Sequence, residues 1–144
     1  MPRAAEAYGS GTALVFDTSA WSRQRHPAVT HRWRATFAAG LAAVCPVVAL
    51  ELLAGARDEE AFGDLDGHLR ALPQAPVTRA ACDRALGTSR ELAGERRLPA
   101  ADYLIAAAAA ERGFAVLHYD RHFDPLCRAL GIESVFIAPR GELD

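Results

Sequence analysis

Short apolar runs alternate with longer amphipathic segments along this chain. The apolar runs predict strands over residues 13–16, 41–45, 115–119 and 134–137, with a weaker strand near 71–74. The segments between them predict helices over residues 20–24, 28–39, 47–56, 58–69, 78–93, 100–112 and 123–130. Because the strands show no alternation of apolar and polar positions, they are typical of a parallel sheet covered on both faces. The pattern therefore predicts a three-layer α/β fold.

The composition is that of one globular domain. The chain has 144 residues, of which 51% are hydrophobic and 24% charged, enough for a core and too apolar for a disordered protein. Residues 1–12 contain no apolar run and are interpreted as a flexible lead-in. No stretch of about 18 apolar residues occurs, so no membrane contact is expected. Cys45, Cys82 and Cys127 have no metal-site spacing and indicate small core residues in a reducing cytoplasm.

All 16 basic residues are arginine. The absence of lysine excludes mechanisms that need a lysine Schiff base or a phosphate-loop lysine. The net charge is only −2, but residues 18–50 include no acid and carry four arginines, Arg23, Arg25, Arg32 and Arg34. With Arg96 and Arg97 they are candidates for binding nucleic-acid phosphates, and solvated arginines on a helix face are the alternative. Trp21 and Trp33 are candidates for stacking on bases, but core or interface packing is the expectation for Trp33 at least.

Four acidic residues stand out by their positions. Asp17 ends the first predicted strand, and Asp120 follows the strand 115–119. Glu51 and Asp102 each lie in the apolar stripe of a predicted helix, at about 100° per residue, which predicts that both face the interior. The alternatives are an N-cap at Asp17, a turn at Asp120, a helix-dipole acid at Asp102 and a core Glu51 paired with arginine.

These acids are expected to converge. The carboxyl ends of parallel strands meet at one edge of the sheet, where functional residues collect, and the inward helix faces reach the same edge. Carboxylates held close together repel one another, and an unpaired buried charge is costly. Because the chain has no lysine to compensate, a hard divalent cation, Mg²⁺ or Mn²⁺, is the expected partner. Such an ion activates water and binds a phosphate oxygen, which favours phosphodiester hydrolysis.

Four motifs in this order resemble a PIN-domain ribonuclease, specifically a VapC toxin of the VapBC toxin–antitoxin class. The motifs are FDTSAW, PVVALELLAGAR, PAADYLIAAAAAERG and VLHYDRHFD. The resemblance implies a single PIN domain over residues 13–144 with a central parallel sheet of four or five strands. It also implies an endoribonuclease toxin that hydrolyses RNA with a metal-activated water and is neutralised by a cognate VapB-like antitoxin. A homodimer is implied as well, and residues 47–69 are expected to make the partner contacts.

The resemblance assigns the metal and the catalysis to four acids, Asp17, Glu51, Asp102 and Asp120. Ser19 matches the small hydroxyl that supports the metal site. The chain departs from the family pattern at His118, where Thr or Ser is frequent, and at His122, where Asp is frequent. The change at 122 leaves the fourth corner of the site to Asp120, helped by Asp124. Both histidines are expected to be surface histidines beside an acidic loop, with assistance in proton transfer as the alternative.

Two other classes of function remain open. One is a binding-only module, a catalytically weak PIN-like domain that binds RNA or antitoxin without cleaving, because positions 118 and 122 are altered. The other is a phosphatase or phosphotransferase with an aspartyl nucleophile, which residues 16–19 suggest. That chemistry usually needs a second Asp two residues after the first and a later lysine, whereas position 19 is Ser and lysine is absent.

Overall fold

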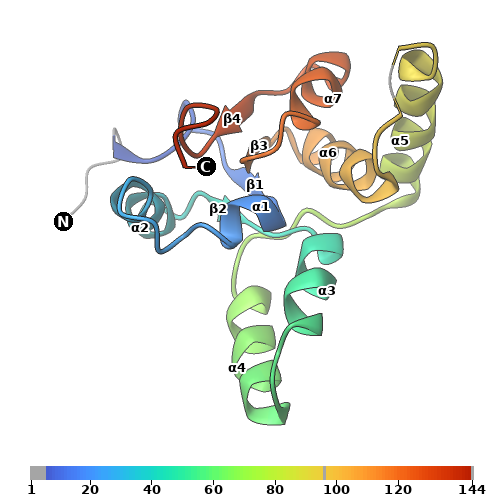
Figure 1. Ribbon diagram of the computed structural model, residues 1–144. Coiled ribbons are helices and arrows are strands. Elements are labelled where there is room, and N and C mark those ends of the chain that lie inside the picture. The colour runs from blue at the N-terminus through green and yellow to red at the C-terminus, as the bar shows by residue number, and fades with distance from the viewer. Residues whose placement is uncertain (1–5, 96, 144) are drawn as a thin grey trace.

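Four short parallel strands form the centre of the molecule. The computed structural model describes residues 6–95 and 97–143, and its sheet has the strand order β2-β1-β3-β4 (Figure 1). The strands are β1 (Leu14–Phe16), β2 (Ala42–Ala43), β3 (Ala115–His118) and β4 (Ser134–Phe136). β1 lies between β2 and β3, with Val15 beside both Ala43 and Val116. The parallel sheet confirms the predicted fold class.

Helices connect and cover these strands in the described part of the chain. They are α1 (Thr18–Trp21), α2 (Thr30–Ala38), α3 (Pro46–Ala54), α4 (Glu59–Arg70), α5 (Arg79–Leu92), α6 (Ala100–Arg112) and α7 (Phe123–Leu130). Local signals set several helix ends. The Thr78 hydroxyl accepts a hydrogen bond from the N–H of Ala81 at 3.1 Å before α5, and Gly113 ends α6 at a φ of 69°. Helices α6 and α7 have the predicted bounds.

The order of the strands places helices on both faces of the sheet. The chain passes from β1 out to β2, and later strands then continue on the other side of β1. Because parallel connections are right-handed, the first connection and the later ones cover opposite faces. Figure 1 shows α2 on one side of the sheet and α6 and α7 on the other, while α3 and α4 project as a hairpin, called the arm below. No helix of the described residues is long and apolar enough to cross a bilayer.

The weaker strand expected near residues 71–74 is reduced to a single bridge. Gln74 pairs with Val44 in the parallel sense. The N–H of Val44 donates to the carbonyl of Pro73, and the N–H of Ala75 donates to the carbonyl of Val44, both at 2.9 Å. Pro73 and Pro76 lack the N–H that a longer ladder requires, so the pairing stops there. The sheet therefore has four strands of the four or five expected.

Trp21 and Trp33 belong to the core. Each is only 6% exposed, and their ring centroids lie 5.2 Å apart in an edge-to-face arrangement. The ring of Phe16, from β1, lies 4.6 Å from that of Trp33. The interpretation that the tryptophans stack on bases is wrong, and the core alternative is confirmed, because the rings fill the space between β1, α1 and α2.

The segment before β1 packs on the domain through Tyr8. This residue is fully buried, its hydroxyl donates to the carbonyl of Ile137 at 2.7 Å, and its N–H donates to the Thr36 hydroxyl at 2.9 Å. The Arg32 guanidinium lies 4.2 Å from its ring centroid. At this point the structure differs from the flexible lead-in expected over residues 1–12, because Tyr8 finds partners far away in the sequence. Residues 1–5 lie outside the described residues.

Candidate active site

Asp17 follows the last residue of β1 and caps helix α1. Its Oδ2 accepts a hydrogen bond from the N–H of Ser19 at 3.0 Å and another from the Ser19 hydroxyl at 2.6 Å. Asp17 is 7% exposed, and burial raises its pKa; the bonds from Ser19 oppose that rise, whereas the negative charge of Asp120 adds to it. The alternative role of Asp17 as an N-cap is therefore confirmed. The negative charge of Asp120 acts on the same carboxylate.

Asp120 lies in the loop that follows β3, beside Asp17, because β1 and β3 are neighbours in the sheet. Its Oδ1 accepts a hydrogen bond from the N–H of His122 at 2.9 Å, so the expected turn is confirmed. The Ser19 hydroxyl oxygen accepts a hydrogen bond from the N–H of Tyr119 at 2.9 Å. Ser19 thereby ties the end of β1 to the loop that carries Asp120.

Asp102 lies in the first turn of α6, and the prediction that it faces inward is confirmed by its exposure of 9%. Burial raises its pKa to about 6, the charges of Asp17 and Asp120 add to the rise, and His122 opposes it. Part of the rise in the pKa of Asp102 therefore comes from the carboxylates at the end of β1 and in the loop after β3.

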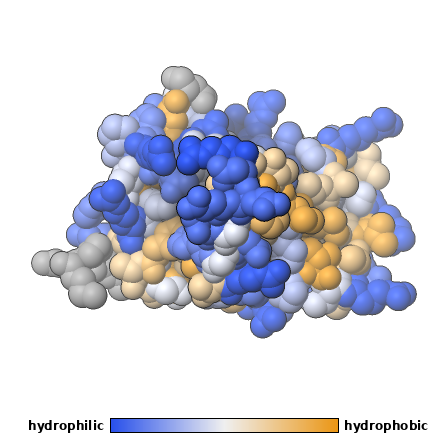
Figure 2. Space-filling model, turned by 90° about the horizontal axis from the view of Figure 1, so that it is seen from below, coloured by the Kyte–Doolittle hydropathy of each residue, from blue (hydrophilic) through white to orange (hydrophobic). Residues whose placement is uncertain are grey.

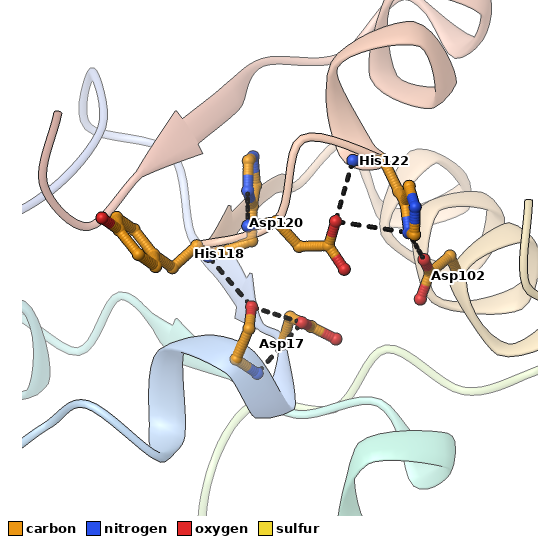
Figure 3. A network of polar contacts seen from close by, with 7 residues as sticks. Asp17, Asp102, His118, Asp120 and His122 are labelled. Carbon is orange, nitrogen blue, oxygen red and sulfur yellow. Dashed lines mark hydrogen bonds and ion pairs between the residues drawn. The ribbon is translucent and has the colours of Figure 1, made fainter. Parts of the chain in front are cut away.

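His122 completes this cluster, and the sequence interpretation did not place it there. Its Nδ1 lies 3.2 Å from Oδ2 of Asp102 and 3.2 Å from Oδ1 of Asp120. One ligand atom from each of these three residues lies within 4.8 Å of the others, close enough to hold one metal ion. Figure 3 shows the side chains of Asp17, Asp120 and Asp102 turned toward one another, with the His122 ring between the last two. Asp120 and His122 stand two residues apart in the sequence, and this spacing was the signal that could have indicated that His122 joins the site.

Glu51 is exposed, and the prediction that it faces the interior is wrong. Helix α3 belongs to the arm. Val48 is its buried residue, whereas Ala54 and Gly55, on the same face as Glu51, are exposed. Glu51 still approaches the site from outside, because the Thr18 hydroxyl donates a hydrogen bond to its Oε2 at 3.2 Å. The structure therefore places Glu51 at the rim of the acidic cluster.

His118 is fully buried, so its interpretation as a surface histidine is wrong. Its Nδ1 accepts a hydrogen bond from the N–H of Asp120 at 3.1 Å, and its Nε2 lies 2.7 Å from the Ser134 hydroxyl, which donates to Asp124 at 2.8 Å. Burial lowers the pKa of His118 to about 4, against the charges of Asp124 and Asp120. Asp124 is therefore linked to His118 through the Ser134 hydroxyl and does not join the cluster of Asp17, Asp102 and Asp120.

Arginines surround the acids on the solvent side. A hollow of about 430 Å³ beside Asp120 is lined by three of them, Arg23, Arg121 and Arg140. A second hollow, of about 530 Å³ beside His122, is lined by Arg97, Arg121 and Arg140. Of the arginines singled out in the sequence, Arg23 and Arg97 reach these hollows and Arg96 lies outside the described residues. Arg121 was missed although it stands between Asp120 and His122 in the sequence. Arg140 was missed because it reaches the site only through the fold.

The sequence pattern that defines the PIN domain matches residues 14–129. The chain belongs to the PIN-domain family. Among its PIN-domain relatives, Ribonuclease VapC18 of Mycobacterium tuberculosis is 36% identical over 137 residues, which cover 90% of this chain and 100% of that protein. Ribonuclease VapC51 of the same organism is 36% identical, with 90% of this chain and 96% of the relative covered. The chain therefore groups with the VapC ribonucleases, as its motifs indicate.

Solved structures of VapBC proteins share the fold. A DNA-bound VapBC from Salmonella typhimurium has a TM-score of 0.66 at 19% identity, covering 88% of this chain and 99% of that chain. VapBC2 from Rickettsia felis, bound to a DNA fragment from the promoter, has a TM-score of 0.69 at 15% identity. The match covers 87% of this chain and 98% of that chain. At these identities the likeness confirms the PIN-like α/β architecture around the acidic cluster.

Proposed function

We propose that this PIN-domain chain is a metal-dependent endoribonuclease that holds Mg²⁺ or Mn²⁺ among Asp17, Asp102 and Asp120, with Glu51 at the rim. The observation that carries the proposal is the convergence of three carboxylates from three elements. Burial raises the pKa of Asp102 to about 6, and the charges of Asp17 and Asp120 add to that rise. A divalent cation removes the repulsion among them. The oxygen-rich donor set fits the ligands that such ions prefer.

The chain's own residues prepare the site for this chemistry. A bound ion supplies an activated water and neutralises charge on the phosphate. Ser19 holds the Asp17 carboxylate through two hydrogen bonds, and the N–H of His122 holds that of Asp120. These bonds fix the direction of both carboxylates, so little reorganisation is needed when the substrate phosphate arrives. The Glu51 carboxylate accepts a hydrogen bond from the Thr18 hydroxyl. We assign Glu51 a contact with the ion through a water molecule.

The arginine-lined hollows are the proposed path of the RNA strand. Arg23 lines one hollow and Arg97 the other, and Arg121 and Arg140 line both. A strand that crosses the acids would place phosphates against guanidinium groups before and after the scissile bond, and each contact would make binding more sensitive to salt. We place this activity in the cytoplasm, where RNA is present and the free thiols of the chain persist.

A VapB-like antitoxin is the proposed protein partner, since the structural relatives described above are VapBC complexes. The arm, which corresponds closely to the expected segment 47–69, is its proposed binding site. Beside the arm, a hollow of about 280 Å³ is lined by Trp21 and by His68 of α4. The indole N–H of Trp21 is buried and has no acceptor among the described residues. A carbonyl of the antitoxin chain would satisfy that donor.

A homodimer is proposed through exposed apolar residues of α3 and α5. Leu50 of α3 and Leu86 of α5 are 69% and 56% exposed, and an apolar hollow of about 330 Å³ lies between α5 and α6. Figure 2 shows hydrophobic surface gathered beside the end of the arm, on the side where α5 lies in Figure 1. Leu86→Glu should convert a dimer to a monomer in sedimentation, and an unchanged mass would place the dimer contact elsewhere.

RNA cleavage by the purified chain with Mg²⁺, with Mn²⁺ and with EDTA tests the enzymatic proposal. Asp102→Asn removes a carboxylate of the cluster without changing core volume, and it should abolish cleavage while the circular dichroism spectrum stays the same. Glu111→Gln is the matched control, because Glu111 lies on the same helix and pairs with Arg84 at 2.8 Å, away from the acids. Full activity is expected in that variant.

Each outcome separates the enzyme from the binding-only module. Cleavage that needs metal and disappears in Asp102→Asn supports the nuclease. RNA binding without cleavage of total RNA under any of the metals favours the catalytically weak module. Cleavage that persists in EDTA would contradict the metal-dependent mechanism.

A further inference from the structure

His122 brings a nitrogen atom into a cluster otherwise made of carboxylate oxygens. The residue ends the short loop after β3 and precedes α7. Its Nδ1 lies at equal distances, 3.2 Å, from an oxygen of Asp102 and an oxygen of Asp120. The ring is thus held between two carboxylates from different elements, with its nitrogen turned toward both.

These separations match neighbouring ligands of one metal ion. In an octahedral site with metal–ligand distances of about 2.1 Å, ligand atoms at right angles are about 3.0 Å apart. The two nitrogen–oxygen distances of 3.2 Å are within a few tenths of an ångström of that value. The three ligand atoms all lie within 4.8 Å of one another, so one ion can contact all of them. Little movement of Asp102, Asp120 or His122 is required.

A hydrogen bond holds the backbone of the loop that carries His122, and the His122 ring is accessible to solvent. The N–H of His122 donates to Oδ1 of Asp120 at 2.9 Å, which sets the backbone of the loop. The side chain is 39% exposed, and it borders the hollow of about 530 Å³ lined by Arg97, Arg121 and Arg140. A hydrated ion can therefore enter from this side and keep some of its water.

The geometry points to His122 as a nitrogen ligand of the ion in the proposed nuclease site, which makes the site selective for first-row transition divalent cations over Mg²⁺. The inference rests on the proposed function. Imidazole nitrogen suits transition ions, whereas Mg²⁺ retains oxygen ligands and water. A His122 ring beside two carboxylates thus adds a preference that an all-carboxylate site lacks.

The alternative role for His122 is that of a counter-charge. A protonated imidazole between Asp102 and Asp120 would reduce their repulsion and then turn away when an ion binds. The two roles differ in one observable, namely whether a nitrogen atom contacts the bound ion. Mn²⁺ is a stringent probe, because it stands lowest among the transition ions in affinity for such ligands.

Pulsed electron paramagnetic resonance of Mn²⁺ bound to the full chain measures that contact directly. Coupling to ¹⁴N should be present in the wild type and absent in His122→Asp, which replaces the nitrogen ligand with oxygen. His122→Asn, with no added charge, should lose the coupling as well. His31→Gln is the control, since His31 is exposed and pairs with Glu6 away from the site, and it should keep the coupling.

Competition between Mn²⁺ and Mg²⁺ gives a second readout. The ratio of Mn²⁺ to Mg²⁺ affinity should fall about tenfold or more in His122→Asp, the scale on which site-supporting contacts affect metal affinity. Mn²⁺ bound to the wild type without ¹⁴N coupling would overturn the role of His122 and leave the proposed nuclease standing with oxygen ligands. A wild type that binds no Mn²⁺ at all would overturn the proposed metal site and, with it, this inference.

Discussion

The hydroxyl of Ser19 donates a hydrogen bond to Asp17 at 2.6 Å and accepts one from the N–H of Tyr119 at 2.9 Å. One small side chain therefore orients a carboxylate at the end of β1 and joins it to the loop after β3. Since Asp17 and Asp120 lie on those two segments, Ser19 sets their relative position. Its role is positional, because it touches the acid and not the proposed ion.

Ser19→Ala should weaken Mn²⁺ binding and RNA cleavage by about 10- to 100-fold, because the loss of an outer hydrogen bond leaves the ligand free to turn. Calorimetric titration with Mn²⁺ measures the first effect. Ser22→Ala is the matched control, because among the described residues the Ser22 hydroxyl donates to the carbonyl of Ser19 and accepts from Arg23, just after α1. Equal metal affinity in Ser19→Ala and the wild type would remove Ser19 from the support of the site.

Asp102→Asn should stabilise the metal-free protein at neutral pH. The folded-state pKa of about 6 lies above the ordinary value of 3.8, so the folded state binds more protons than the unfolded state between these pH values. The free energy of unfolding therefore falls as pH rises from about 4 to about 6, and the full cost, on the order of 3 kcal/mol, is present above pH 6. Asp102→Asn has no carboxyl group at this position to ionise, so the variant avoids this cost.

Urea unfolding of both proteins in EDTA checks this prediction. The advantage of Asp102→Asn should be full at pH 7.5 and should shrink as pH falls through 6 toward 4. Glu111→Gln, on the exposed side of the same helix, should show no advantage of this kind. A difference that stays constant across this range would contradict the raised pKa.

Tyr8→Phe should lower the free energy of unfolding by about 1–2 kcal/mol. The variant keeps the ring in its buried site but leaves the carbonyl of Ile137 without the donor that now lies 2.7 Å away. Thermal unfolding measures the effect. Ser10→Ala, which removes a hydrogen bond to Glu133 on the surface, is the control with a smaller expected change. If Tyr8→Phe were as stable as the wild type, this part of the lead-in would contribute little to the fold.

Cys82 should be the thiol that reacts first with an aromatic disulfide reagent in the folded protein. Cys45 and Cys127 are buried, and burial raises the pKa of both, that of Cys127 to about 12. The thiolate that attacks the reagent is therefore scarce at both positions. Cys82→Ser should remove the fast phase of thiol release. A fast phase that remains in this variant would indicate that the core opens readily.

The sequence alone determined the elements of this protein and their order. The apolar runs predicted all four strands, and a cap at Thr78 and glycine at 113 marked helix ends that the structure confirms. These features are local, since strand and helix signals act over a few residues. Asp17 was also predicted to lie at the site from its place at a strand end, and Asp102 from its place in an apolar helix stripe.

The tertiary structure decided what covers each face. Glu51 has the same kind of apolar stripe as Asp102, yet it is exposed because α3 projects in the arm while α6 lies against the sheet. Burial of Tyr8 and the contact of His122 with Asp102 join residues far apart in the chain. A helical pattern identifies which residues share a face but carries no information on what packs against it, and this is why those positions required the fold.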